Sequence, residues 1–430
     1  MSSKPRLSVI CAPPNGFNPG MTSVDIAVKD IAAELGADVT FWRMWDQSEW
    51  REPLGGSHLV DSDRVYDVGS GMTYTLSRGR LDRVMDADAV VFWGDFLHME
   101  VYLRQTADVL ARRMGCMSLD AAFDTATQHY LLRDWDVGSL GRVMTFGSTL
   151  SFNTAHAYAS SYGKQLARFI GGVRRAWFRD PYSATVAQSF RSDDLTCKAP
   201  DAAFLLPSAP RGETSGQLGV FIGRSDLKPE SVAAFGKGLA QELDLQPRWI
   251  PWGQEPGFWP MDQRRRFRAA WPGLEHGTAH PSPSQIAQTV WGAALGRSND
   301  RIQPTISELF DLIASCSVIL TDTYHLAVNA WRLGTPAICL TDGDHQAWNV
   351  NAGEPGNPRD KRYDLYSQLD ALPLLVDGRR LRSVRDHTAQ AVAERLNDGT
   401  VVRIATSRVE KMAASSRSTL LSELRGILSR

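Results

Sequence analysis

The segment SVILTDTYHLAVNAWRLGTPAICL, residues 317–340, decides the fold of this chain. Val318–Thr321 form a run of apolar or β-branched residues bounded by polar ones, which is typical of a fully buried parallel strand. Apolar residues then repeat at helical spacing: Leu326, Ala330 and Leu333. Gly334 and the nearby Pro336 end that helix, and a second apolar run follows up to Leu340. Strand, helix and strand in this order predict a parallel sheet covered by helices.

The same alternation extends along the whole chain. In the first half we expect these strands: Leu7–Cys11, Asp38–Trp42, Asp88–Trp93, Arg142–Gly147, Arg175–Asp180 and Ala202–Leu206. In the second half we expect these: Leu218–Asp226, Pro247–Trp252, Ser317–Asp322, Pro336–Leu340 and Leu372–Asp377. A capping box, Thr305 with Glu308, predicts a helix from Ile306 to Ser315.

A chain of 430 residues is longer than one hydrophobic core usually supports, so two domains are expected. Leu205–Gln217 has the Pro, Gly and Ser content of a linker. The predicted fold class is α/β, with two Rossmann-like domains facing across a cleft. We place the first domain at residues 1–211 and the second at 212–395. Residues 396–430 read as C-terminal helices, which we expect to pack back on the first domain.

Composition excludes several classes of protein. The 47 basic and 48 acidic residues give a net charge of −1, so no general attraction for nucleic acid or anionic membranes is expected. The five cysteines are widely spaced without a CxxC pair, which encodes neither a disulfide framework nor a zinc site. No apolar stretch approaches the roughly 20 residues that cross a bilayer. A cytoplasmic protein without a membrane segment or metal is expected, and a homo-oligomer is compatible with the sequence.

His325 stands where the predicted strand ends and the next helix begins, with Asp322 or Thr323 as the candidate N-cap. A helix N-terminus favours a bound anion and lowers the pKa of an imidazole, so this position suits a phosphate-facing proton donor. A core or capping histidine is the alternative. Ligands of open α/β sheets bind beyond the carboxyl ends of the strands, which is where His325 lies.

Several segments together resemble the polysaccharide pyruvyltransferase family. The segments that carry the resemblance are VVFWGDFL (Val90–Leu97), VMTFGSTLSF (Val143–Phe152), FRDPYS (Phe178–Ser183), APDAAFLLP (Ala199–Pro207), TDTYH (Thr321–His325) and DKRYDLYSQLDALPLLVD (Asp360–Asp377). The family implies a fold like that of GT-B glycosyltransferases. It also implies transfer of an enolpyruvate-derived group from phosphoenolpyruvate to sugar hydroxyls, usually leaving a pyruvate ketal, as in exopolysaccharide biosynthesis.

The resemblance also implies roles for particular residues. Arg179 and His325 correspond to the family residues that contact phosphoenolpyruvate, and Lys361 fits a basic residue found downstream. Thr323 and Tyr324 belong to the same donor motif. No cofactor is implied beyond phosphoenolpyruvate as the donor substrate.

Two departures from the family stand out. Many members have Arg where this chain has Thr323, and that change removes a bidentate phosphate ligand. Arg224 in IGRSD either replaces it or is a plain surface residue. The turn that ends in Asp95 has less glycine than the family pattern, and Asp95 is a candidate acceptor-binding residue.

The residues suggest a mechanism in which His325 protonates the donor methylene carbon. Asp95 or Asp322 could accept a proton from the acceptor hydroxyl, and Asp322 has the better position, three residues from His325. A structural role of Asp322 as an N-cap is the alternative. Asp180 either orients Arg179 or ends a helix. Trp252 and Trp259, in a segment rich in Trp and Pro, are candidates for stacking on an acceptor sugar. They equally fit a rigid loop that packs its own tryptophans.

Two other functions remain open at this point. The first is a GT-B glycosyltransferase that uses a nucleotide sugar, although no acidic ribose-binding motif is found in the second half. The second is a non-catalytic binding protein on the same fold. The sequence does not identify the sugar-containing acceptor, which is compatible with a polysaccharide, a lipid-linked sugar or a small metabolite.

Overall fold

The computed structural model describes most of the chain. The described residues are 4–12, 18–44, 58–61, 63–67, 71–78, 80–94, 97–114, 117–151, 153, 155–193, 195–207, 214–223, 225–252, 261–276, 305–342, 360–381 and 388–429.

The first sheet has eight strands in the order β3-β4-β5-β2-β1-β6-β7-β8. The strands are β1 (Arg6–Cys11), β2 (Asp38–Arg43), β3 (His58–Asp61), β4 (Arg64–Asp67), β5 (Met72–Leu76), β6 (Ala89–Trp93), β7 (Val143–Ser148) and β8 (Arg175–Phe178). β5, β2, β1, β6, β7 and β8 run parallel, while β3, β4 and β5 form an antiparallel meander at one edge. The parallel strands β6 and β7 are fully buried because helices cover both faces of the sheet.

Helices connect the strands of this first domain. They are α1 (Pro19–Leu35), α2 (Leu81–Met85), α3 (Glu100–Met114), α4 (Leu119–Tyr130), α5 (Val137–Leu140), α6 (Ala155–Ala159), α7 (Ser161–Gly172), α8 (Pro181–Ser189) and the 3-10 helix η2 (Ala202–Leu205). The Asn18 side chain caps α1 by accepting from the Met21 N–H, and Pro19 follows at the first position of the helix. α1 therefore begins at the carboxyl end of β1.

The second sheet has six strands in the order β11-β10-β9-β12-β13-β14, and all of them are parallel. The strands are β9 (Gln217–Phe221), β10 (Gln246–Trp249), β11 (Glu275–His276), β12 (Val318–Thr321), β13 (Ala337–Thr341) and β14 (Leu375–Asp377). The helices are α9 (Pro229–Glu242), α10 (Met261–Ala270), α12 (Ile306–Ser315), α13 (Tyr324–Arg332), α15 (Lys361–Leu369), η3 (Leu372–Leu374), α16 (Ala389–Asp398) and α17 (Thr400–Leu428).

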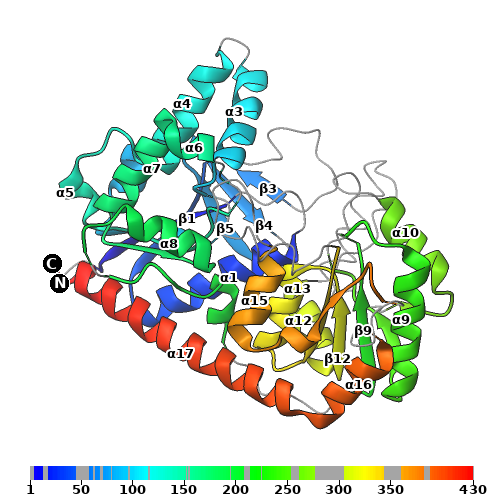
Figure 1. Ribbon diagram of the computed structural model, residues 1–430. Coiled ribbons are helices and arrows are strands. Elements are labelled where there is room, and N and C mark those ends of the chain that lie inside the picture. The colour runs from blue at the N-terminus through cyan, green and yellow to red at the C-terminus, as the bar shows by residue number, and fades with distance from the viewer. Residues whose placement is uncertain are drawn as a thin grey trace.

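α17 crosses from the second domain back to the first and lies along both (Figure 1). Near its end, Glu423 forms ion pairs with Arg174 and Arg175 beside β8. Its apolar face belongs to a core cluster that includes side chains from α1 of the first domain and from α13 of the second. One continuous core therefore joins the two domains.

The predicted fold class is confirmed, since two sheets with parallel strands are each covered by helices. The expected helix from Ile306 to Ser315 is also confirmed, and both hydrogen bonds of its capping box are present. The domain boundaries stay predictions. The described strands of the first sheet end at Phe178, and those of the second begin at Gln217.

The expected strand at Ala202–Leu206 is wrong. The segment is the 3-10 helix η2, because the Asp201 side chain accepts from the Ala203 N–H and caps a helical turn there. The antiparallel meander β3-β4-β5 was not predicted. The first part of Leu372–Asp377 is also helical, so only Leu375–Asp377 forms a strand.

Candidate active site

His325 lies in the first turn of α13, directly after β12, as the sequence predicted. Thr323 is the N-cap residue by its backbone, but its side chain makes no capping hydrogen bond. The hydroxyl of Thr321 accepts from the Thr323 N–H and shapes the turn instead. His325 is buried, with 8% of its surface exposed.

The first domain contacts His325 through the start of α1. A Cβ atom at Gly20 would lie 2.6 Å from both Cβ and Nδ1 of the histidine, so only glycine fits beside the imidazole. Asn329 strengthens this contact by donating to the His325 carbonyl at 2.7 Å and to the Ser23 hydroxyl at 3.0 Å. The start of α1 therefore fixes α13 and its histidine against the first domain.

Arg179 and His325 meet at one carboxylate, that of Asp201. Arg179 follows β8, and its Nη1 donates to Asp201 Oδ2 at 2.7 Å. The same Oδ2 lies 3.7 Å from His325 Nε2. Burial opposes ionisation of this carboxyl group, but Arg179 and His325 outweigh that effect and hold the pKa of Asp201 below its ordinary value. The structure thus brings together the two residues that the sequence assigned to the donor.

Gly147 allows Asp201 to approach the first sheet. The glycine has φ +74° beside an irregularity in the pairing of β7 with β8. A Cβ atom there would lie 3.0 Å from Ala202 Cβ and 3.1 Å from Ala202 N. η2 therefore packs closely on the end of β7 and carries Asp201 toward Arg179.

Tyr324 contacts two cationic side chains. The guanidinium carbon of Arg179 is 4.7 Å from the ring centroid, and Lys361 Nζ is 5.1 Å from it. Both distances suit cation–π attraction. Arg179 comes from the first domain and Lys361 from the second, so one aromatic ring brings together three predicted donor-binding residues.

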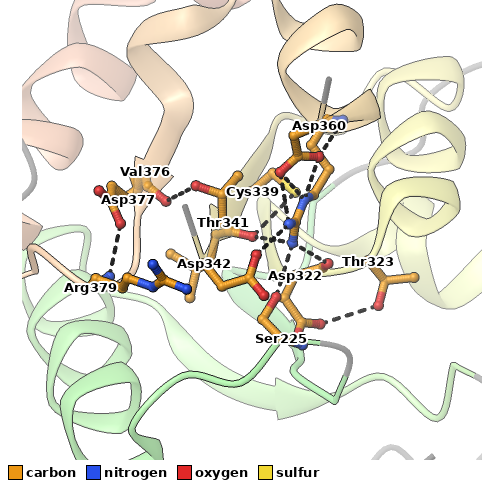
Figure 2. A network of polar contacts seen from close by, with 12 residues as sticks. Ser225, Asp322, Thr323, Cys339, Thr341, Asp342, Asp360, Val376, Asp377 and Arg379 are labelled. Atoms are coloured by element: carbon orange, nitrogen blue, oxygen red, sulfur yellow. Dashed lines mark hydrogen bonds and ion pairs between the residues drawn. The ribbon is translucent and has the colours of Figure 1, made fainter. Parts of the chain in front are cut away.

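Asp322 has structural partners for both oxygens of its carboxylate. The oxygens accept from the Gly223 N–H at 3.1 Å, from the Ser225 N–H at 2.8 Å and from the Thr323 hydroxyl at 3.2 Å. Figure 2 shows Asp322 between Thr323 and Ser225. This carboxylate holds the turn after β9, and its role as a base stays a prediction.

Sequence reasoning missed Arg362, which lies beside Lys361 at the start of α15. The guanidinium donates to the Asp360 carboxylate, the Asp342 carboxylate and the Ser225 hydroxyl. It also donates to the carbonyls of Asp322 and Leu340. Burial alone would lower the pKa of Arg362, but Asp360 and its other neighbours raise it above the ordinary value. Four of its partners, Asp360, Asp342, Asp322 and Ser225, are labelled in Figure 2.

The segment DKRYD held the available signal for Arg362. Asp360 is the N-cap of α15 and is followed by two basic residues, of which the family resemblance indicated only Lys361. The structure uses both residues. Arg362 joins the carboxyl ends of β9, β12 and β13, while Lys361 faces the Tyr324 ring.

Asp180 begins a helix, whereas the structural alternative considered from the sequence was that it ends one. Its carboxylate accepts from the Ser183 N–H at 2.8 Å, from the Ser183 hydroxyl and from the Thr149 hydroxyl, both at 2.6 Å. It is thereby the N-cap of α8. The backbone carbonyl of the preceding Arg179 accepts from the Gln368 side chain, which adds a contact between the two domains.

Of the predicted acceptor-binding residues, the structure describes only Trp252. Trp252 is 2% exposed and belongs to the core cluster shared by both domains. Its indole therefore packs in the interior, and its acceptor-binding role stays a prediction. Arg224, Asp95 and Trp259 lie outside the described residues. Among the described residues, no helix has the length and apolarity to span a membrane.

Residues 141–344 match the family model for polysaccharide pyruvyl transferase, which confirms the resemblance. No curated protein matches the chain. Similar solved structures include an alpha-glucosyltransferase in complex with UDP and a 13-mer DNA, with TM-score 0.41, 11% identity and 100% of each chain covered. Another is the α,α-trehalose 6-phosphate synthase from Burkholderia multivorans, with TM-score 0.43, 10% identity and 99% of each chain covered.

Proposed function

We propose that this chain is a pyruvyltransferase that moves an enolpyruvate-derived group from phosphoenolpyruvate to hydroxyls of a sugar-containing acceptor. One observation supports the proposal above others. Arg179 and His325, which the family resemblance assigns to the donor, come from different domains and meet at the Asp201 carboxylate. They do so at the carboxyl ends of β8 and β12, where open α/β sheets bind their ligands.

The charges around this point suit a donor that carries both a carboxylate and a phosphate. Arg179 presents a planar guanidinium that can bind either group through two hydrogen bonds. Lys361 adds a second cation beside the Tyr324 ring. The N-terminus of α13 adds N–H groups and a partial positive charge, which favour an anion. These groups compensate for the family arginine that Thr323 replaces.

In the proposed reaction, protonated His325 transfers a proton to the methylene carbon of phosphoenolpyruvate. The electron pair of the C=C bond forms the new C–H bond and leaves an oxocarbenium ion at C2. An acceptor hydroxyl attacks C2 and loses its proton to the base, for which Asp322 is the candidate. Phosphate then departs with the C–O electron pair and leaves a second oxocarbenium ion at C2. A second hydroxyl attacks this ion, loses its proton to the departing phosphate and closes the ketal. The scheme uses no cofactor besides the donor.

Calorimetric titration of the purified protein tests the donor without knowledge of the acceptor. Phosphoenolpyruvate and, separately, common nucleotide sugars are titrated into the wild type, Arg179→Ala and His325→Ala. Arg191→Ala is the matched control, since Arg191 is a paired arginine of the same domain that contacts Asp193 instead of the site. A thermal melt of each variant verifies that it is folded.

We expect saturable binding of phosphoenolpyruvate that Arg179→Ala weakens by about tenfold or more, as for loss of a hydrogen bond to a charged group. Arg191→Ala should bind like the wild type. Binding of a nucleotide sugar without binding of phosphoenolpyruvate would replace this proposal with a glycosyltransferase. If neither phosphoenolpyruvate nor a nucleotide sugar gives a heat of binding, the result would favour a non-catalytic protein.

A further inference from the structure

Asp201 is a buried acid for which the proposed reaction has no role so far. It is 3% exposed, and it follows Ala199 and Pro200 in the segment that leads from the first sheet to the second. Its Oδ1 accepts from the Ala203 N–H, while its Oδ2 faces Arg179 at 2.7 Å and His325 at 3.7 Å. A cap of a four-residue 3-10 helix requires only the first of these contacts.

The groups around His325 come from four other elements. η2 contributes Asp201, and the turn between β8 and α8 contributes Arg179. α15 contributes Lys361, which contacts the ring of the neighbouring Tyr324. α1 contributes Gly20, which has no titratable side chain. Within the turn before α13, the carboxylate of Asp322 accepts from backbone N–H groups and from Thr323.

A carboxylate at this distance favours the imidazolium form of histidine over the neutral form. The positive charge of Arg179 opposes that effect. However, Arg179 is paired with Asp201 at 2.7 Å, so the carboxylate offsets part of the charge of the guanidinium. A donor that binds Arg179 would bring further negative charge close to His325. The acid required by the reaction is therefore favoured most when the donor is bound.

We propose that Asp201 is a positioning residue that keeps His325 protonated and oriented for proton transfer to the donor. The inference rests on the proposed function of His325 as the acid. In the transfer step, the proton leaves an imidazolium nitrogen for the donor methylene carbon, and the histidine becomes neutral. Asp201 remains a carboxylate throughout and neither gains nor loses a proton.

The test is an NMR titration of His325 in Asp201→Asn. Asparagine keeps one oxygen, which can cap η2 by accepting from the Ala203 N–H, but it removes the negative charge and the oxygen that accepts from Arg179. The chain has nine histidines, so the signal of His325 is assigned by its loss in His325→Gln. Asp193→Asn is the matched control, because Asp193 also pairs with an arginine, Arg191, outside the site.

We expect Asp201→Asn to lower the pKa of His325 by roughly one unit or more, while Asp193→Asn leaves it unchanged. An unchanged pKa in Asp201→Asn would overturn the proposal. Because the titration needs no substrate, this result is independent of whether phosphoenolpyruvate is the donor. Failure of the donor titration described above would instead remove the proposed function and leave the measured coupling between Asp201 and His325.

A pH profile adds a readout that a purely structural role would not change. With a working acceptor, kcat/KM should fall with rising pH as His325 loses its proton, and in Asp201→Asn this fall should begin at lower pH. A uniform decrease at every pH, with no displacement of the profile, would overturn the proposal. Asp201→Glu keeps the charge and should restore most of the wild-type profile.

If Asp201→Asn does not fold, Arg179→Gln provides the same test with the opposite sign. Without the guanidinium, the Asp201 carboxylate acts on His325 alone, and the pKa of His325 should rise. No rise in that variant would contradict the coupling between the three side chains.

Discussion

Gly20 allows α1 of the first domain to approach His325 closely. The imidazole packs on the first turn of α1, where any side chain would overlap it. The position of His325 after a buried strand followed from local sequence, because strand and helix signals lie within a few residues of it. The neighbours Gly20 and Asp201 could not be predicted, since they lie more than a hundred residues away in sequence and meet His325 only through tertiary packing.

Gly20→Ala should impair the site more than the fold. The new methyl group would overlap His325 Cβ and Nδ1, and a displacement of about 1 Å in a catalytic group can lower the rate about 100-fold. Overpacking should also lower the free energy of unfolding by about 1–3 kcal/mol. The measurements are kcat/KM once an acceptor is known, the His325 NMR signal, and urea denaturation.

Gly426→Ala is the matched control, because Gly426 lies in α17 with no atom within 4 Å of a Cβ placed there. It should leave the His325 signal unchanged and raise the free energy of unfolding by up to about 1 kcal/mol. An identical His325 signal in Gly20→Ala and wild type would show that the histidine is not held by α1.

At the scale of elements, the turn after β9 and the starts of α13 and α15 form one polar cluster around Arg362. The strands that contribute to it were predictable, because each is an apolar run bounded by turn residues. Their order in the sheet was not predicted. The contacts of Arg362 depend on that order, since β9, β12 and β13 are neighbours in space and distant in sequence. The error at η2 has a similar cause, because a short apolar run fits strand and 3-10 helix equally well.

Arg362→Met should strongly destabilise the second domain. Methionine fills much of the same space, but it leaves the Asp360 carboxylate buried without its cation. Removing one partner of a buried ion pair typically lowers the free energy of unfolding by about 3–5 kcal/mol. Urea denaturation followed by tryptophan fluorescence measures this change.

Arg380→Met is the control for that variant. Arg380 pairs with Asp377 at 3.3 Å, but its side chain is half-exposed, and such pairs contribute about 0–1 kcal/mol. Equal losses of stability in the two variants would mean that Arg362 contributes no more than a surface ion pair.

For the whole molecule, α17 connects the two domains. Leu420, Leu421, Leu424 and Ile427 enter the shared core, while Arg417 and Arg425 pair with Glu34 of α1. The apolar spacing along this segment indicates a helix by itself. Which surface the helix covers depends on the arrangement of both sheets, which no local pattern specifies.

Leu424→Ala should destabilise both domains together. Leu424 is 1% exposed, and truncation of such a leucine typically lowers the free energy of unfolding by about 2–5 kcal/mol. Circular dichroism and fluorescence should still report one coincident transition in urea. Ile404 of the same helix is 39% exposed, so Ile404→Ala should change the free energy of unfolding by less than about 1 kcal/mol. Separate transitions for the two domains in the wild type would contradict a shared core.

The return of α17 to the first domain affects the order in which the protein folds on the ribosome. Val24, Val28 and Ile31 of α1 belong to the same core cluster as Leu420 and Leu424. At about 5–20 residues per second, synthesis separates these two parts of the core by roughly 20–80 seconds. Until α17 emerges from the ribosome, the nascent first domain exposes the apolar surface that α17 later covers. A chaperone that binds this surface during the interval would prevent aggregation.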